Sequence, residues 1–262
     1  MKILQSTNQY GIRADDDFFT NITDLQMPMQ ESNKIATLNN QGFMRVELDK
    51  HSLSWVKLSS QTIQPCLELG SAYGQASIEC LKQGGTVIAN DISPEHLVIL
   101  RSRVDSKLHH KLYLNNSSFP DELILPHNSI SNILFCRLGH FFDDQTLIKS
   151  FKKAYQYLLP EGKLFFVAVS PHHYTLREKF LPLFKKRKQN KEENIGCIEN
   201  MRDYIPRSKD KIPKFMNCFD EDTIQQLIRE TEFLIVENSL FDYGTNNSDG
   251  RGFIGVEMIK KG

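Results

Sequence analysis

The chain has 262 residues, of which 40% are hydrophobic and 24% are charged, and its 32 basic and 32 acidic side chains cancel. This length favours one large α/β domain or two small ones, with enough apolar surface for a full core. The balanced composition excludes wholesale disorder, and no apolar run approaches the ~18 residues of a membrane span.

The five cysteines lie far apart and include no C-x-x-C pair. A disulfide scaffold or a structural zinc site is therefore not expected, and no metal site is predicted. The first eleven residues lack the apolar segment of a cleaved signal peptide. We expect a protein of a reducing, cytoplasmic compartment, with export by a route without a cleaved signal as the alternative.

The N-terminal part of the chain differs in pattern from the rest. Residues 1–30 are irregular and polar, whereas residues 31–63 contain apolar residues at helical spacing over 33–39 and 52–58. Residues 1–63 are therefore predicted to form an N-terminal helical cap, and residues 64–262 the main domain.

From residue 64 onward, short apolar strands alternate with helices. Strands are predicted at 65–69, 86–90, 111–114, 130–136, 163–169, 233–240 and 253–259, and helices at 75–82, 94–107, 144–159 and 221–230. This alternation is typical of a parallel sheet with helices on both faces. The last two strands have no helix between them, so they should form an antiparallel hairpin. The sequence thus predicts an α/β, doubly wound, mostly parallel seven-stranded sheet with a C-terminal hairpin and an inserted lid after strand five.

That insertion, residues 171–217, carries a local excess of positive charge. Between Arg177 and Lys214 there are twelve Lys and Arg against six Asp and Glu, and 185–188 is the densest stretch. Clustered charge raises the local potential and attracts anions, whereas a solvated helix end is the plainer interpretation.

Ligands of such sheets bind beyond the carboxyl ends of the strands. The first of these positions holds Glu68 and a turn of small residues at 70, 72 and 74, which permits a close backbone approach to a ligand. The dinucleotide pattern G-x-G-x-x-G would need a glycine at 75, where the chain has Gln75. The pattern acidic-x-G-x-G-x-G fits with one change, Ala72. Asp91, 17 residues past Gly74, is placed to accept both hydroxyls of a ribose, although it also stands where the next helix starts.

The segment from about residue 66 to 170 resembles the class I S-adenosylmethionine-dependent methyltransferases. The resemblance is carried by ELGSAYG (68–74), ANDISPEHL (89–97), SISNILFCRLGHFF (129–142) and LLPEGKLFFVAV (158–169). It continues in CFDEDTIQQLI (218–228), FLIVENSLF (233–241) and GFIGVEMI (252–259). It covers about two thirds of the chain and implies a methyltransferase fold, S-adenosylmethionine as the cofactor and methyl transfer as the activity.

The resemblance also implies roles for the residues of the first turn. Glu68 anchors the turn near the methionine end of the cofactor, and Gly70, Ala72 and Gly74 pass beneath it. In the next turn Asp91 holds the ribose, and Ile92 packs on the adenine.

In the family an acidic residue after the third strand often contacts the adenine amino group. Here no acid occurs until Asp121, so Ser117 or Ser118 is expected to accept that hydrogen bond. The loop after strand four, residues 137–140, would face the methyl group and the substrate, with Arg137 among the cofactor-binding residues.

A general base is needed only where the acceptor must lose a proton. His140 is the candidate because it lies on the loop after strand four, and a packing role beside Phe141 is the alternative. His172, His173 and Tyr174 border the same cleft. Arg45 and Trp55 are further candidates, which would cover the carboxylate end of the cofactor.

The predicted function is methyl transfer to a small molecule or a protein side chain, and an anionic acceptor is favoured if the basic insertion selects it. Nucleic acid stays open as a partner, although the N/D-P-P-[YF] and Pro-Cys motifs of many nucleic-acid methyltransferases are absent after strand four. A catalytically inactive binding module for S-adenosylmethionine or S-adenosylhomocysteine is the first alternative, and a nicotinamide-dependent oxidoreductase the second. The sequence does not indicate the oligomeric state.

Overall fold

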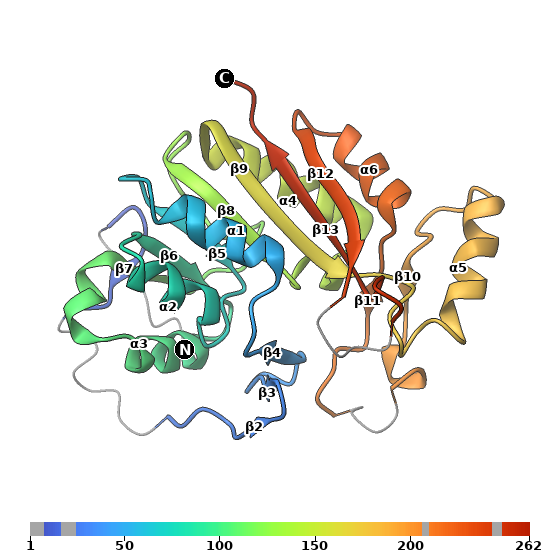
Figure 1. Ribbon diagram of the computed structural model, residues 1–262, viewed down its shortest axis with the longest axis horizontal. Helices are drawn as coiled ribbons and strands as arrows, with labels where there is room; N and C mark the ends of the chain where they lie inside the picture. Colours follow the sequence, from blue (N-terminus) through green and yellow to red (C-terminus); the bar gives the residue numbers. More distant parts are fainter. Residues whose placement is uncertain (1–7, 17–24, 206–209, 243–247) are drawn as a thin grey trace.

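The computed structural model describes residues 8–16, 25–205, 210–242 and 248–262, and a single twisted sheet forms its centre (Figure 1). From one edge to the other, its strands are β1 (Ile12–Arg13), β7 (Leu112–Asn115), β6 (Val87–Asn90), β5 (Cys66–Leu69), β8 (Ile130–Cys136), β9 (Leu158–Val169), β13 (Phe253–Ile259) and β12 (Leu234–Phe241). The five strands from β7 to β9 are parallel, and β1, β13 and β12 are antiparallel to their neighbours.

All seven predicted strands and the C-terminal hairpin are confirmed. The structure adds an eighth strand, β1, whose two residues pair with Tyr113 and Leu114 of the edge strand β7. The observed sheet is therefore one strand larger than predicted.

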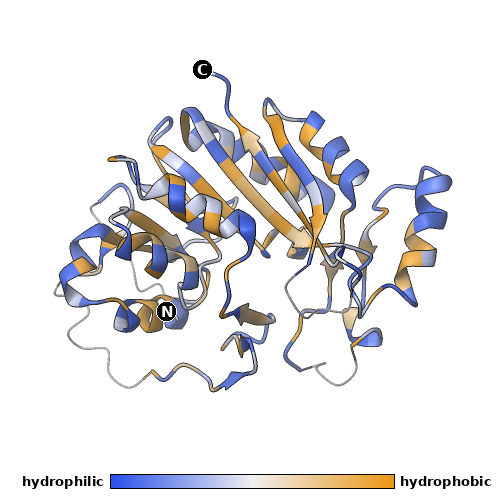
Figure 2. Ribbon diagram, viewed as in Figure 1, coloured by the Kyte–Doolittle hydropathy of each residue, from blue (hydrophilic) through white to orange (hydrophobic). Residues whose placement is uncertain are grey.

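Helices cover both faces of the sheet, as predicted. The helices α1 (Lys50–Ser59), α2 (Gln75–Lys82) and α3 (Pro94–Arg103) pack on one face, and α4 (Asp144–Tyr157) and α6 (Glu221–Arg229) pack on the other. Figure 2 shows the apolar residues gathered along the central strands between these layers. The strand β5 is buried along its whole length, as expected of a parallel strand covered on both faces.

Two helices end earlier than predicted. The helix α3 stops at Arg103 and is followed by the 3-10 segment η2 (Ser106–Lys111). The helix α4 stops at Tyr157, because Pro160 disfavours a helical conformation at the residue before it. Within the described ranges, no helix combines the length and the apolar character that crossing a membrane requires.

The N-terminal segment differs from the expected run of helices. It contains a small antiparallel sheet made of β2 (Gln30–Glu31), β3 (Lys34–Ala36) and β4 (Phe43–Arg45), followed by α1. The prediction of a helix over 33–39 is therefore wrong. The turn 37–42 is closed by a 3.0 Å bond from the Thr37 amide to the Gly42 carbonyl, and both Asn40 and Gly42 have positive φ. These turn-forming residues outweigh the helical spacing of the apolar positions.

The insertion after β9 forms a small unit with its own apolar core. It contains α5 (Phe180–Gln189), the 3-10 segment η4 (Met201–Asp203) and the antiparallel pair β10 (Cys197–Ile198) and β11 (Met216–Asn217). Phe43 of β4 packs against this core, so the N-terminal segment and the insertion meet. The helix α5 lies at the outer edge of the molecule, beyond β10 and β11 (Figure 1). The movement of this unit as a lid stays a prediction.

The basic stretch 185–188 is partly engaged within the chain. Lys188 Nζ lies 2.5 Å from Asp220 Oδ2 and 2.7 Å from Asp222 Oδ2. Arg187 Nη1 donates a 2.8 Å hydrogen bond to the Cys197 carbonyl. Lys188 therefore holds the insertion to α6 and its N-cap, and Arg187 joins two parts of the insertion itself. This weakens the interpretation of 185–188 as a surface for an anionic acceptor.

Candidate functional site

The turn between β5 and α2 adopts the conformation that its small residues predict. Gly70, Ala72 and Gly74 have φ values of +67°, +46° and +76°. A Cβ at Gly74 would lie 2.3 Å from Leu100 Cδ1, so close packing against α3 also requires glycine there. Ala72 adopts the left-handed conformation at a cost of about 1–2 kcal/mol. The turn thus has the left-handed conformation at three positions where the sequence predicts a ligand.

Glu68 holds this turn from below. Its buried carboxylate accepts hydrogen bonds from the Ser77 hydroxyl and, at 2.9 Å, from the Ser77 amide in the first turn of α2. Burial is the main reason that the pKa of Glu68 is raised to about 7. The negative charge of Asp91 also acts to raise this pKa, and the positive charge of Arg137 acts to lower it. Glu68 therefore anchors the turn, and Arg137 lies within electrostatic reach of it.

Asp91 follows β6 and is bonded to three groups. Its Oδ2 accepts a 2.8 Å hydrogen bond from the Ala72 amide, and its Oδ1 accepts one of 2.8 Å from the Ser93 amide. The ring nitrogen Nδ1 of His96 lies 3.1 Å from the same Oδ1. The carboxylate is thereby fixed against the turn 70–74.

The residues around Asp91 lie at the carboxyl ends of β6 and β7. Ile92 exposes 67% of its surface, so its apolar side chain is open to a flat ring. Asn116 Nδ2 donates to the carbonyls of Asp91 and Ile92, at 2.9 and 2.8 Å. This amide ties the loop after β7 to the residues that follow β6.

Ser117 and Ser118 lie in that same loop. The Ser117 carbonyl accepts a 2.8 Å hydrogen bond from Asn90 Nδ2, which holds the loop beside β6. Asp121 instead bonds to Lys149 of α4. The first acid after the third strand is therefore paired with α4.

The loop after β8 lies at the same edge of the sheet, on the other side of β5. Arg137 has a φ of +54° and donates its amide to the Val167 carbonyl at 2.7 Å, and Leu138 would touch a Cβ placed on Gly70. His140 lies in the 3-10 segment η3 (Gly139–Phe141), buried, with its Nδ1 bonded to no described residue. Burial, and after it the positive charge of Arg137, lower the pKa of His140 to about 3.

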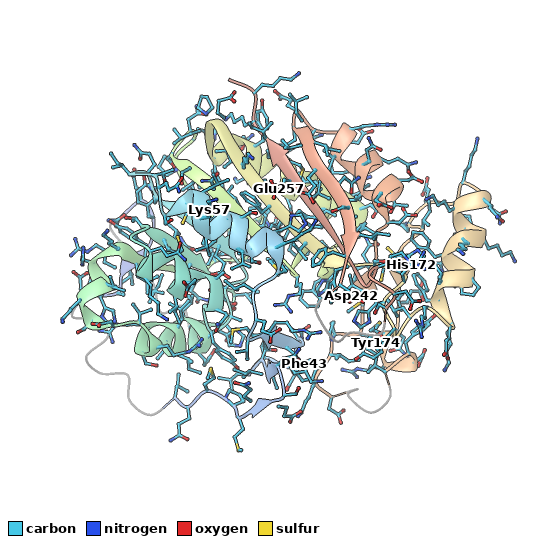
Figure 3. The ribbon with its side chains drawn as sticks, in the orientation of Figure 1. Phe43, Lys57, His172, Tyr174, Asp242 and Glu257 are labelled. Carbon is cyan, nitrogen blue, oxygen red and sulfur yellow. The ribbon has the colours of Figure 1, made fainter. Side chains whose placement is uncertain are left out.

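The insertion contributes His173 to this side. Burial, and after it the positive charge of Arg45 on β4, lower the pKa of His173 to about 4. His173 Nδ1 lies 2.8 Å from Thr175 Oγ1, and its ring stacks at 4.5 Å from the ring of Tyr174. Figure 3 shows His172 and Tyr174 on the same side of the molecule as Phe43. His173, His140, Arg137 and Arg45 thus share one electrostatic neighbourhood.

Trp55 does not belong to the site. It is fully buried in the apolar layer beneath α1, where its Nε1 donates to the Asn132 carbonyl at 3.4 Å. The prediction that it covers the cofactor is therefore wrong. It fills the core instead, as large aromatic side chains commonly do.

Three polar residues near the site escaped the sequence analysis. They are Asp49, which caps α1 and accepts a 3.5 Å bond from Cys136 Sγ, His96, which contacts Asp91, and Asn116. Only Asp49 has a local signal, because Asp before a helical segment is typical of an N-cap.

Comparison with known proteins gives the same fold. Residues 66–162 match the family described as a methyltransferase domain. No curated protein matches the sequence. A methyltransferase structure from Methanosarcina mazei has a TM-score of 0.58 and 17% identity, covering 82% of this chain and 99% of its own.

Two further structures were solved with S-adenosylhomocysteine bound. The 1,6-didemethyltoxoflavin-N1-methyltransferase of Burkholderia thailandensis has a TM-score of 0.55 and 12% identity, covering 81% of this chain and 79% of its own. The magnesium protoporphyrin IX methyltransferase of Synechocystis has a TM-score of 0.52 and 11% identity, with 80% of each chain covered. At such identities the likeness shows the fold. The chain thus has the methyltransferase fold, and residues 66–162 at its centre match the methyltransferase-domain family.

Proposed function

We propose that the chain transfers a methyl group from S-adenosylmethionine to a small anionic acceptor held at the carboxyl edge of the sheet. The observation that supports this proposal is electrostatic: Arg137 and His173 both act on His140, and Arg45 acts on His173, so that charged groups from three segments influence one place. Two guanidinium groups and two neutral imidazoles favour a negative ligand over a positive one.

The residues of the first turn fit the cofactor. Asp91 Oδ2 accepts one bond within the chain and has a second lone pair to offer a ribose hydroxyl. The hydroxyl of Ser71, buried in the turn, has no partner among the described residues, so a ligand group would satisfy it. In this proposal Glu68, Gly70, Ala72 and Gly74 line the methionine side.

The adenine end would lie on the opposite side of Asp91. Ile92 would pack on the base, and the loop at Ser117 and Ser118 would bond its amino group. Arg137 would pair with the methionine carboxylate, because it lies within electrostatic reach of Glu68.

When bound, the cofactor would supply an electrophilic methyl group on a sulfonium sulfur, for transfer to an electron pair of the acceptor. Because charge disperses in that step, orientation is the main contribution of the chain, worth about 7–11 kcal/mol in well-aligned reactions. The N-terminal strands and the insertion would exclude water from the reacting groups.

In this proposal His140 is the side chain that faces the transferred methyl group. With its pKa lowered to about 3, the imidazole is neutral near pH 7 and a weak base. Its role would be to orient the acceptor through Nδ1, rather than to remove a proton from a poorly acidic group. An acceptor that is already deprotonated, such as a carboxylate, suits this environment.

Burial and the structural neighbours both favour a small acceptor over a protein. His140 is 6% exposed, so an acceptor must enter an enclosed space to reach it. The neighbours from Burkholderia and Synechocystis are named for the small molecules 1,6-didemethyltoxoflavin and magnesium protoporphyrin IX.

The test is incorporation of labelled methyl groups into a cell extract, sorted into small-molecule, protein and nucleic-acid fractions. Label should enter the small-molecule fraction, in a product that has lost negative charge, and Arg45→Met should reduce the amount. Label in protein or nucleic acid alone would contradict the small acceptor. Binding of S-adenosylhomocysteine without incorporation would support the inactive binding module instead.

A further inference from the structure

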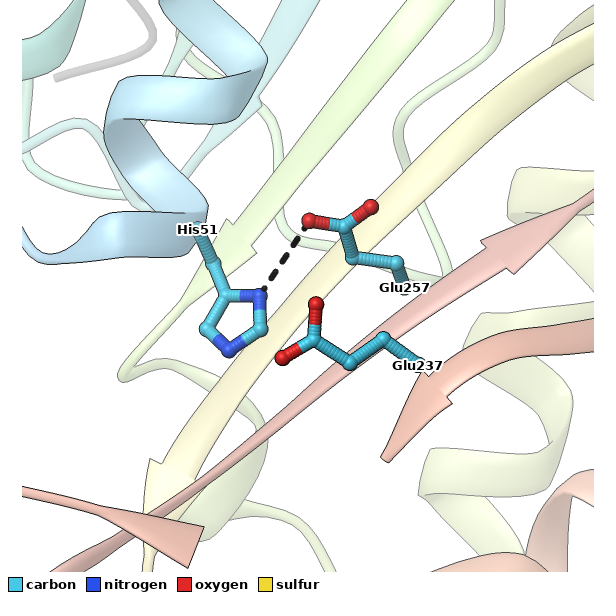
Figure 4. A group of neighbouring side chains, drawn as sticks. All are labelled: His51, Glu237 and Glu257. Atoms are coloured by element: carbon cyan, nitrogen blue, oxygen red, sulfur yellow. Dashed lines mark ion pairs between the residues drawn. The ribbon is translucent and has the colours of Figure 1, made fainter. Parts of the chain in front are cut away.

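A buried histidine and two glutamates meet on the sheet face covered by α1, where the helix packs against the hairpin β12–β13. His51 of α1, Glu237 of β12 and Glu257 of β13 each offer one ligand atom, and these atoms lie within 4.8 Å of one another (Figure 4). His51 Nδ1 lies 3.5 Å from Glu257 Oε1. His51 precedes Glu237 by 186 positions and Glu257 by 206, so no local sequence spacing could reveal the group.

The His51 ring lacks the partners that a buried imidazole normally has. Its side chain is 1% exposed, and neither ring nitrogen has a hydrogen-bond partner among the described residues. Buried polar groups without partners are rare in native proteins, and each requires an explanation. Figure 4 shows the carboxylates of both glutamates directed toward this ring.

The backbone beneath the His51 ring has no side chain at Gly255, which leaves room for the ring. A Cβ on Gly255 would lie 1.9 Å from His51 Nε2, so any other residue at 255 would displace the imidazole. Phe241 contacts the ring edge-on at 5.4 Å and closes another side. The site is therefore built around His51.

We propose that His51, Glu237 and Glu257 bind a divalent transition-metal ion, zinc by ligand chemistry, which joins α1 to the C-terminal hairpin. One imidazole and two carboxylates leave a fourth tetrahedral position for water. An imidazole ligand favours zinc over magnesium or calcium, which prefer oxygen alone.

The distances suit this ion. Bonds of ~2.0–2.2 Å at tetrahedral angles separate two ligand atoms by roughly 3.3–3.5 Å, which matches the spacing of His51 and Glu257. Glu237 is the ligand that must approach further. Its side chain is 42% exposed, so it has room to rotate.

Two lysines neutralise the glutamates when no ion is bound. Lys50 Nζ lies 2.5 Å from Glu237 Oε1, and Lys163 Nζ lies 3.8 Å from Glu257 Oε2. Both ammonium groups are at the rim, where they are 50% and 27% exposed, so an ion can displace them into solvent. In this proposal Lys50 competes with the metal ion for Glu237. A site that held only ion pairs would show no such competition.

The experiment titrates the full-length protein, freed of metal by a chelator, with Zn²⁺, and measures stoichiometry and affinity by calorimetry. One ion should bind per chain. Glu237→Gln and Glu257→Gln should each weaken binding by at least the ~10–100-fold that loss of a second-shell partner costs. Glu79→Gln, an exposed carboxylate on α2, is the matched control and should bind as the wild type does.

Lys50→Met separates the metal site from a simple ion-pair network. If the ammonium competes with zinc, this substitution should tighten Zn²⁺ binding and enlarge the rise in Tm that zinc causes. Co²⁺ should show the visible absorption of a four-coordinate site without a thiolate charge-transfer band. The proposal is overturned if the protein binds no zinc, or if both Glu→Gln variants bind it as tightly as Glu79→Gln does.

Discussion

The backbone amide of Ala72 donates a 2.8 Å hydrogen bond to Oδ2 of Asp91, so the left-handed residue of the first turn and the carboxylate after β6 fix each other. The carboxylate needs the amide to satisfy its charge, and the turn needs the carboxylate to hold a conformation that alanine disfavours. Changes at either position should therefore affect both cofactor binding and stability.

Asp91→Ala should weaken the binding of S-adenosylhomocysteine by about 10–100-fold, because a hydrogen bond to a charged group contributes roughly 1.5–3 kcal/mol. Wild-type protein at 100 times the dissociation constant should gain about 2.7 kcal/mol of stability, seen as a rise in Tm. Asp121→Ala, which removes an exposed acid paired with Lys149, is the control and should keep the full rise. An undiminished rise in Asp91→Ala would place the cofactor elsewhere.

Substitutions at positions 72 and 74 should have opposite effects on stability. Ala72→Gly relieves a left-handed alanine and should be neutral or stabilise by about 1 kcal/mol. Gly74→Ala places a Cβ 2.3 Å from Leu100 Cδ1 and should destabilise by about 1–3 kcal/mol. Urea unfolding of both variants measures the difference, and equal midpoints would show that the turn is not held as described.

Glu68 should make stability fall as the pH rises. Its pKa is raised from 4.5 to about 7 in the folded chain, so the folded state keeps a proton that the unfolded state has lost. Its contribution is fully present below pH 4.5 and is lost as the pH rises to about 7, by ~1.4 kcal/mol per pKa unit or about 3 kcal/mol in all.

The variant Glu68→Gln does not titrate, so it should lose this dependence while keeping an acceptor for Ser77. Its free energy of unfolding should gain on the wild type between pH 4.5 and 8, measured by urea unfolding at each pH. Glu79→Gln on the exposed surface should follow the wild-type curve. Parallel curves for Glu68→Gln and the wild type would contradict the raised pKa.

His173 should act in the opposite direction, below neutral pH. Its pKa is lowered from 6.5 to about 4, so the unfolded chain binds a proton that the folded chain refuses. The stability it contributes above pH 6.5 should decline as the pH falls to about 4, by roughly 3 kcal/mol. In His173→Gln the acid-induced loss should shrink by that amount, whereas His127→Gln, an exposed histidine, should lose stability as the wild type does. Acid unfolding followed by circular dichroism provides the comparison.

The parts of the fold that sequence predicts best are those whose signal is local. The run 130–136 is apolar and β-branched, and it is β8 at the centre of the sheet. The strand β1 has two residues and exists only through its pairing with Leu114 and Tyr113, so nothing within it indicates a strand. Likewise, the apolar spacing over 33–39 suits a helix, but the turn at 37–42 favours a hairpin.

The residues of the site also divide into those with a local sequence signal and those without one. Glu68, Gly70 and Asp91 belong to short contiguous motifs whose backbone geometry their residue types dictate. Asn116 reaches Asp91 only because β7 lies beside β6, and Arg45 comes near His173 only because the separate sheet β2–β4 packs against the insertion. For Trp55 the prediction from sequence erred in the other direction. It placed this aromatic side chain at the cofactor, whereas the side chain fills the apolar core.

The carboxylate that caps α1 has one more effect. Asp49 Oδ2 accepts a 3.5 Å bond from Cys136 Sγ, and burial together with that negative charge raises the pKa of the Cys136 thiol to about 12. A thiolate is a strong nucleophile, and Cys136 is next to the loop that would face an electrophilic methyl donor. With its pKa raised, this sulfur stays a neutral thiol beside that loop, and a thiol is a far weaker nucleophile than a thiolate.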